Sequence, residues 1–308
     1  MRDIMKNVTK LFVLAALSAP TALWVAPSAA SAQATGTREF TVYSRAGEIS
    51  HGTQAPSREQ LMSAITAGSP TALRSLLEYG ERLECHECVP VLQARMLDPR
   101  EPAGVREMAA WWLRRRPFGF GAVMAETRAV LASDPDPARR AVAAEAIGEF
   151  MDPHGVAHLG RALAEDGDVR VRVAAVRGLA RINAAASLPH ISAALRDTTA
   201  EVQEAALQVV LRVNFFRDHD ALLPLLASEQ GSIRRRAALV IGAMDVDAAV
   251  PALSAMVTGD TDEMVRQAAA WALGRIGSAD ARAALREAQG VESSPRVRDA
   301  IEVAMRMR

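Results

Sequence analysis

The sequence predicts an all-α solenoid, an array of about eight stacked repeats of two helices each. The first observation is a unit reading Val-Arg-x-x-Ala-Ala-x-Ala-Leu-Gly, which occurs in seven more or less exact copies along the 308 residues. Its second position is occupied by Arg106, Arg140, Arg172, Gln203, Arg234, Arg266 and Arg298. The second observation is the spacing, because successive copies are 31 to 34 residues apart. A period of this length is typical of arrays in which each repeat buries its apolar face only against its neighbours.

The first helix of each repeat is expected at apolar stretches with proline in their second position. These stretches include Val89–Leu92, Leu188–Ile191 and Val250–Leu253. Proline is tolerated in the first helical turn, where its missing N–H would have no partner within the helix.

The second helix is expected to follow an acidic turn and to contain the alanine-rich unit. Six residues before the second position of four units there is an aspartate: Asp134, Asp166, Asp197 and Asp260. We expect each carboxylate to accept hydrogen bonds from the free N–H groups at the start of the second helix. The arginine one turn later can reach this aspartate or its counterpart in the next repeat. Such a ladder of charges orders a stack rather than performing catalysis.

Residues 1–32 are expected to be a secretory signal peptide. A positive start, containing Arg2, Lys6 and Lys10, precedes the apolar stretch 11–26 and the small residues Ala30-Ser31-Ala32. The apolar stretch is shorter than the roughly 20 residues of a bilayer-spanning helix, although an uncleaved anchor is the alternative. The pattern resembles a bacterial signal peptide, so we expect a mature chain that begins at Gln33, is periplasmic or secreted, and is not stably inserted in a membrane.

Charge gives no indication of a nucleic-acid partner. Without residues 1–32 the chain would have 33 basic and 35 acidic side chains, a formal net charge of −2. This balance provides no overall attraction to nucleic acid or to anionic lipid.

The region before the regular array divides into a linker and a cap. Residues 33–56 have turn and polar character and are expected to form a linker with at most one short strand, around the apolar residues Phe40, Val42 and Tyr43. Residues 57–84 are expected to form two short helices, the first opened by Ser57 and Gln60 at the spacing of a capping box. We interpret this pair as a degenerate capping repeat and residues 85–308 as the array itself.

Two segments carry a family resemblance: Val265–Gly277 and Arg139–Gly148. They resemble the short HEAT-like repeats first associated with phycobilin lyases, and the resemblance covers about residues 57–308. It implies a protein-binding scaffold more often than an enzyme, with a lyase as the enzymatic alternative. A branch that resembles deoxyhypusine hydroxylase needs repeated His-Glu pairs to hold two irons. The only His-Glu dipeptide here is His86-Glu87, which lies between repeats and excludes that branch.

Cys85 and Cys88, the only cysteines, form the one local cluster with chemical potential. In an exported protein we expect a disulfide between them, and a redox pair or a metal site is the alternative. Zinc would need two further ligands, and the pair His154 and His158 lies about 70 residues away in an array that does not fold back. We therefore assign no metal ligands and no cofactor.

The seventh position of the unit varies in the way a solvent-facing position does. It is occupied by Trp111, Glu145, Arg177, Gln208, Leu239, Trp271 and Val303. The third position lies one turn earlier on the same face and includes Arg235. Tryptophan together with arginine is typical of interface hot spots. The candidate binding residues are therefore Trp111, Arg177, Arg235, Leu239 and Trp271; the alternative is that both tryptophans pack over their neighbours.

The run Arg114-Arg115-Arg116 is a further candidate. Cations at a helix C-terminus complement the helix dipole, and a basic patch for an acidic partner is the alternative. Taken together, the sequence predicts an exported scaffold that binds a protein partner. A lyase or a thiol-redox enzyme built on the same repeats is the alternative, and no catalytic residue is assigned.

Overall fold

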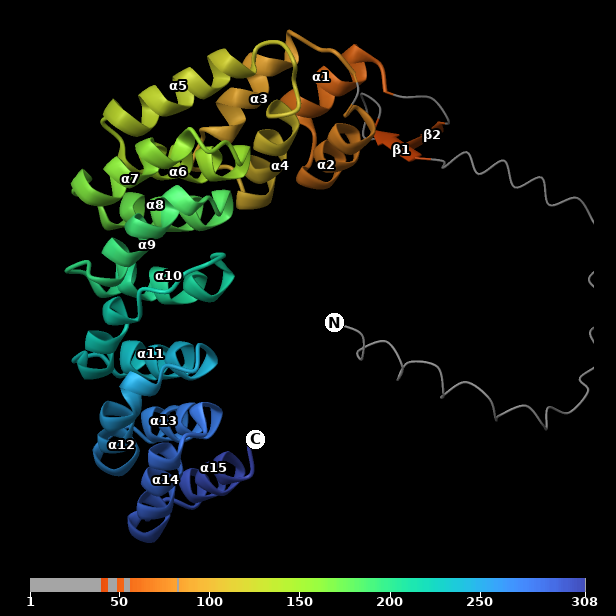
Figure 1. Cartoon of the computed structure of the whole chain (residues 1–308). Coiled ribbons are helices and arrows are strands. Elements are labelled where there is room, and N and C mark those ends of the chain that lie inside the picture. Colours follow the sequence, from red (N-terminus) through yellow and green to blue (C-terminus); the bar gives the residue numbers. More distant parts are fainter. Residues whose placement is uncertain (1–39, 44–48, 53–55, 82, 308) are drawn as a thin grey trace, which may run out of the picture. The chain divides into compact units, whose positions relative to one another are not determined.

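The computed structural model describes residues 40–43, 49–52, 56–81 and 83–307 (Figure 1). All of them belong to one of the two units into which the chain divides, Glu39–Arg308. The expected signal peptide and its cleavage site lie outside the described residues.

Two short strands lie in the segment that the sequence suggested to be a linker. β1, Phe40–Tyr43, pairs antiparallel with β2, Ile49–Gly52, so that Phe40 is opposite Gly52 and Tyr43 is opposite Ile49. The sequence indicated at most one strand because β2 reads Ile-Ser-His-Gly, in which only Ile49 is of a residue type typical of strands.

The rest of the described chain is helical, which confirms the predicted all-α solenoid. The paired helices are α1 (Arg58–Ala67) with α2 (Pro70–Tyr79), α3 (Cys88–Met96) with α4 (Ala103–Leu113), α5 (Phe120–Ser133) with α6 (Pro137–Phe150), α7 (Gly155–Glu165) with α8 (Val169–Ile182), α9 (Leu188–Leu195) with α10 (Ala200–Val209), α12 (Val250–Gly259) with α13 (Glu263–Ile276), and α14 (Ala279–Val291) with α15 (Pro295–Met305). Short 3₁₀ turns, η1 (Ala185–Ser187) and η5 (Asp247–Ala249), lead into α9 and α12.

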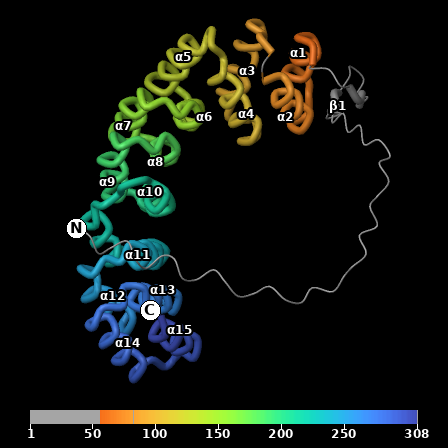
Figure 2. The backbone as a smooth tube through the Cα atoms, turned by 45° about the vertical axis from the view of Figure 1, so that its right-hand side comes forward, coloured from red at the N-terminus to blue at the C-terminus, as the bar shows by residue number. Residues whose placement is uncertain are grey.

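The helices form two layers, one of first helices and one of second helices (Figure 2). Neighbouring second helices approach so closely that the final glycine of the unit has no room for a side chain. A Cβ on Gly148 would lie 2.5 Å from the Cα of Gly178, and a Cβ on Gly242 would lie 2.6 Å from the Cα of Ala272. The small residues of the unit therefore fix the distance between repeats, and the apolar core runs between the two layers.

One repeat departs from this pattern. α10 ends at Val209 and continues as the 3₁₀ turn η2 (Val210–Arg212), and the turns η3 (His219–Ala221) and η4 (Leu223–Ala227) replace the first helix before α11 (Gly231–Ala243). Phe215, in the connection between η2 and η3, has a φ of 63° and a side chain that is 78% exposed. A left-handed backbone is unusual for a bulky residue, so this connection is a distinct feature of the array.

Candidate functional site

The predicted charge ladder exists and joins consecutive repeats. Arg140 donates from Nε and Nη2 to the two carboxylate oxygens of Asp166 in the next repeat, at 2.8 and 2.9 Å. Its Nη1 donates to the backbone carbonyl of Asp134, six residues earlier, at 2.9 Å. The same arrangement recurs in the pairs Arg172–Asp197, Arg234–Asp260 and Arg266–Glu292. Each guanidinium therefore connects its own repeat to the following one.

We expected the ladder aspartates to cap the second helices, but the capping residue lies two positions later in the chain. Asp166 ends the first helix α7, and the residue that caps the second helix α8 is Asp168, which accepts from the N–H of Arg170 at 2.8 Å. Asp166 instead accepts from the N–H of Asp168 at 2.9 Å and from Arg140. A carboxylate has two oxygens with several lone pairs, so one group can accept from both the backbone and the guanidinium.

Arginine holds the pKa of the ladder carboxylates low. The hydrogen bonds from Arg140 lower the pKa of Asp166, and those from Arg234 and Arg266 do the same for Asp260 and Glu292. In these three carboxylates burial opposes the lowering of the pKa but is a smaller influence than the arginine hydrogen bonds. The ladder is thus a set of ionised, bidentate pairs whose members are fully engaged with one another.

The ladder has a gap at the irregular repeat. Gln203 occupies the arginine position and donates from Nε2 to the carbonyl of Asp197 at 2.8 Å. Ser228 occupies the position of the next carboxylate, in the same extended conformation as Asp166 and Asp260. The carboxylate and the guanidinium are therefore both replaced at the junction between α10 and α11.

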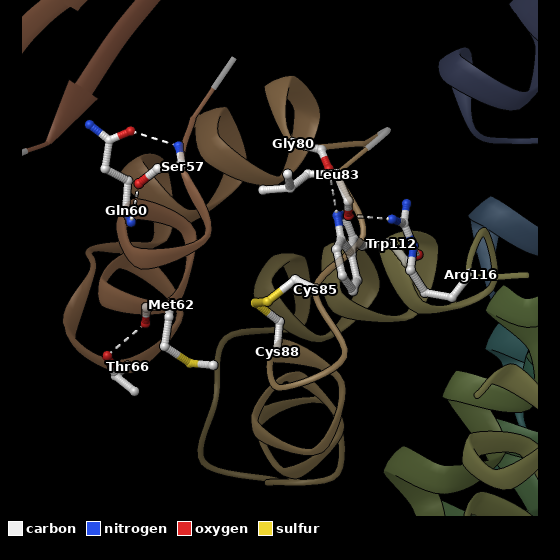
Figure 3. The surroundings of a disulfide bond; sticks show 10 residues. All are labelled: Ser57, Gln60, Met62, Thr66, Gly80, Leu83, Cys85, Cys88, Trp112 and Arg116. Atoms are coloured by element: carbon white, nitrogen blue, oxygen red, sulfur yellow. Dashed lines mark hydrogen bonds between the residues drawn. A yellow bond between two sulfur atoms is a disulfide. The ribbon is translucent and has the colours of Figure 1, made fainter. Parts of the chain in front are cut away.

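Cys85 and Cys88 are joined by a disulfide at the start of α3 (Figure 3). Their relative exposures are 2% and 0%, because the bond packs into the core below Trp112. Thiol–disulfide exchange requires access of an attacking thiolate to a sulfur atom. The burial of both sulfurs favours the structural interpretation of this pair over the redox one.

The three consecutive arginines after Trp112 are engaged within the fold. Arg116 is buried, lies over the Trp112 ring at 3.9 Å, and donates to the carbonyl of Leu83 at 2.9 Å (Figure 3). It also donates to the carbonyl of Glu81. Its burial lowers the pKa of its guanidinium. Arg115 pairs with Glu81 at 2.6 Å, and Arg114 donates to the carbonyl of Glu149 at 2.7 Å. These contacts account for the run by packing between repeats, without an acidic partner.

The third and seventh positions of the unit lie at the edge of the core or on the surface. None of the described residues at these positions is buried. Trp111 is half-buried with Arg115 stacked 4.1 Å from its ring, whereas Leu239 is 40% exposed. Trp271 is half-buried, and its Cζ3 lies 2.9 Å from the place where a Cβ of Gly242 would be. The tryptophans therefore contribute to packing and to the surface at the same time.

Three of the five candidate binding residues meet in one cleft of about 290 Å³ between α11 and α13. This cleft, which we call the α11/α13 cleft, is lined by Arg235, Leu239 and Trp271 together with Arg236, Met264, Gln267 and Ala268. Trp111 and Arg177 lie on α4 and α8, outside the cleft. Sequence reasoning missed Arg236 and Met264. The signal that could have found Arg236 is its place in the fourth position of the unit, where four of the other copies have alanine.

A second cleft, of about 420 Å³, lies at the irregular repeat. Its lining includes Leu211, Phe216, His219 and Met244. It exists because α10 stops early and the 3₁₀ turns leave space beside the end of α11.

Neither a metal centre nor a membrane-spanning helix is found in the described parts of the chain. No three of their histidine, cysteine, aspartate and glutamate side chains are grouped so that they could hold a metal ion. His154 instead places Nδ1 2.8 Å from a carboxylate oxygen of Asp152. Among the helices of residues 56–307, none combines the length and the apolar character needed to cross a bilayer.

Solved structures share the architecture. The Escherichia coli protein YibA matches with a TM-score of 0.53 at 14% identity, over 82% of this chain and 93% of that one. A condensin subcomplex of S. pombe matches with a TM-score of 0.53 at 16% identity, over 76% of this chain and 37% of that one. The phycocyanin lyase complex of CpcE and CpcF from Nostoc sp. gives a TM-score of 0.33 at 18% identity, over 78% and 96%, which is too low to support an argument. At these identities the likeness extends to the fold alone.

The family comparison is consistent with the repeats described above. Curated proteins give no significant match. The model of HEAT repeats matches residues 124–210 and 219–306, which together make up more than half of the chain, and the two matches are separated at the irregular connection. This chain therefore belongs to the HEAT-repeat family.

Proposed function

We propose that this chain is an exported scaffold that binds a protein partner on the surface formed by the third and seventh positions of its second helices. We call this surface the second-helix surface. The observation that carries the proposal is the α11/α13 cleft, where Leu239 and Trp271 lie beside Arg235. Partly exposed apolar side chains next to arginine are typical of the few residues that dominate interface energies.

Two further observations support a scaffold over an enzyme. The four ladder carboxylates, Asp166, Asp197, Asp260 and Glu292, are each occupied by an arginine. The disulfide sulfurs are buried. The likeness to a condensin subcomplex supports the same conclusion, because that array of repeats functions within a protein assembly.

Export is the part of the proposal that depends on the sequence of residues 1–32. The pattern of cations, apolar stretch and small residues is that of a secretory signal peptide. A disulfide between the only two cysteines is consistent with an oxidising compartment such as the periplasm.

Site-specific photo-crosslinking tests the proposal. A photoreactive residue replaces Leu239 on α11 in one variant, and Val291 at the end of α14 in the matched control. Both positions are exposed and apolar, but only Leu239 lies on the second-helix surface. We expect one discrete protein to be cross-linked in the native host through position 239 and not through position 291, and the purified protein to bind the purified chain. Equal cross-linking from both positions, or none from position 239, would refute the proposed surface.

A further inference from the structure

Arg236 is an exception within the repeats. It occupies the fourth position of the unit, which is otherwise small or apolar: Met108, Val142, Ala174, Ala205, Ala268 and Ala300. In these six copies the repeats stack without a cation at the fourth position. Comparison among the repeats therefore indicates that the arginine is not needed for stacking.

Arg235 and Arg236 differ from the neighbouring Arg234. Arg234 is bonded to both carboxylate oxygens of Asp260, at 2.7 and 2.8 Å. Neither Arg235 nor Arg236 makes an ion pair or a side-chain hydrogen bond within the part of the chain that the structure describes. Both are half-buried and line the α11/α13 cleft. Two arginines of the cleft lining therefore have guanidinium groups without a side-chain partner among the described residues.

The rest of the cleft lining is largely apolar and comes from both helices. Met264 and Leu239 are 49% and 40% exposed, and the half-buried ring of Trp271 lies beside them. A cleft of about 290 Å³ is at the lower end of the range for small-molecule pockets, roughly 300–1,000 Å³, and accommodates one or two side chains. Its lining offers positive charge from α11 and apolar area from both helices.

We propose that the α11/α13 cleft binds a short acidic segment of the protein partner. A glutamate or aspartate of that segment pairs with Arg235 and Arg236, and an adjacent aliphatic or aromatic side chain packs on Leu239, Met264 and Trp271. Guanidinium groups suit this role because they bind carboxylates in a bidentate manner and lose hydration more readily than ammonium groups do. This inference rests on the proposed function and adds the chemistry of the partner to it.

Fluorescence anisotropy with labelled peptides tests the inference on the purified chain. The probe peptide contains two glutamates followed by leucine and phenylalanine. One control peptide has lysines in place of the glutamates, and a second has serines in place of the leucine and phenylalanine. We expect the probe to bind more tightly than both controls and its affinity to fall as salt screens the charges. Equal affinity for the lysine peptide would overturn the acidic part of the inference, and equal affinity for the serine peptide would overturn the apolar part.

Variants of the chain then locate the site. Arg236→Ala restores the residue found in four other repeats, so the fold is expected to tolerate it, and the affinity for the probe is expected to fall about tenfold. Arg286→Ala removes an exposed arginine from α14 and is the charge-matched control, for which we expect unchanged affinity. Circular dichroism checks that both variants are folded. An unchanged affinity of Arg236→Ala would place the peptide elsewhere and overturn the inference.

Failure of the acidic-segment inference can be distinguished from failure of the proposed function. If position 239 cross-links a partner but the probe does not bind, the second-helix surface remains and the acidic chemistry is wrong. If the probe binds in the cleft but no partner is cross-linked, the cleft is an acidic-peptide site and the scaffold proposal fails.

Discussion

Trp271 shows how one side chain can belong to a surface and to the packing beneath it. Its ring covers Gly242 on the neighbouring helix, where a Cβ would approach Cζ3 to 2.9 Å. The glycine is needed there because the ring and the backbone of α13 leave no space for a methyl group. Removal of the ring therefore removes contacts between two repeats as well as exposed area.

We expect Trp271→Ala to lower the free energy of unfolding by about 1–3 kcal/mol, because a half-buried aromatic side chain is deleted beside a glycine that cannot fill the space. A fully exposed ring would instead leave the thermal midpoint almost unchanged. Urea denaturation of the variant and of Leu239→Ala, whose side chain is 40% exposed, measures the difference. A smaller loss for Trp271→Ala than for Leu239→Ala would contradict the packing role.

The cysteine pair gives a second prediction at the scale of residues. We expect freshly isolated native protein to have no titratable thiols, and the reduction of its disulfide to be slow until denaturant exposes the buried sulfurs. The loop closed by the bond is short, so its loss should cost less than the roughly 3 kcal/mol expected for a 15-residue loop. Thiol titration with and without denaturant provides the measurement. Rapid titration of the folded protein would show free or accessible cysteines instead.

At the scale of elements, the ladder couples stability to pH. The folded pKa of Asp166, Asp260 and Glu292 is lowered by their arginines, so these carboxylates hold their protons more weakly in the folded state than in the unfolded one. Their contribution is fully present above the unfolded pKa, about 4, and is lost as the pH falls through the folded values.

We therefore expect the thermal midpoint to change little between pH 7 and pH 5 and to fall steeply below about pH 4. Asp260→Asn should lower the midpoint at pH 7 and reduce its acid dependence, because one of the coupled carboxylates is removed. Calorimetry over this pH range provides the measurement. An acid dependence equal to that of the unmodified chain would show that Asp260 contributes nothing to it.

The gap in the ladder can be closed by two substitutions. Gln203→Arg with Ser228→Asp would recreate the spacing of Arg172 and Asp197, which are also 25 residues apart, on a backbone that already has the required conformation. We expect the pair to stabilise the protein by about 1 kcal/mol more than the sum of the single substitutions. A double-mutant cycle by urea denaturation measures this coupling. Gln208→Arg, which adds the same charge at an exposed position of α10, is the control and should show no coupling with Ser228→Asp.

The sequence allows the ladder to be predicted but not the exact role of each member. Three of the acidic turns contain two carboxylates two residues apart, Asp134 and Asp136, Asp166 and Asp168, and Asp260 and Asp262, and in each turn both are chemically suitable as caps. Only the helix boundaries decide between them. The irregular repeat was not predictable, because Leu223-Pro224-Leu225-Leu226 has the same pattern as the first helices of its neighbours and forms 3₁₀ turns instead. The α11/α13 cleft was predicted in part, since the seventh position pointed to Leu239 and Trp271, whereas Met264 lies before the unit and is brought to them by the helix α13.

At the scale of the whole molecule, the processing of the N-terminus decides where the array acts. We expect protein isolated from the native host to have the intact mass of a chain that begins at Gln33, because Ala30-Ser31-Ala32 has the small residues of a cleavage site. Mass spectrometry of the periplasmic and membrane fractions provides the measurement. Recovery of the full-length chain in the membrane fraction would indicate an uncleaved anchor.

The missing ladder pair also has a mechanical consequence. In a stack whose repeats contact only their nearest neighbours, each junction is held by the contacts at that junction alone. Ladder ion pairs connect α6 with the repeat of α8, α8 with the repeat of α10, α11 with the repeat of α13, and α13 with the repeat of α15. No ladder ion pair connects α10 with the repeat of α11, because Gln203 takes the place of the arginine. A partner that binds the array on both sides of this junction would therefore bend the array mainly at the junction. We expect the strain of such a load to concentrate in the connection around Phe215 while the tied repeats on either side move as stiff segments.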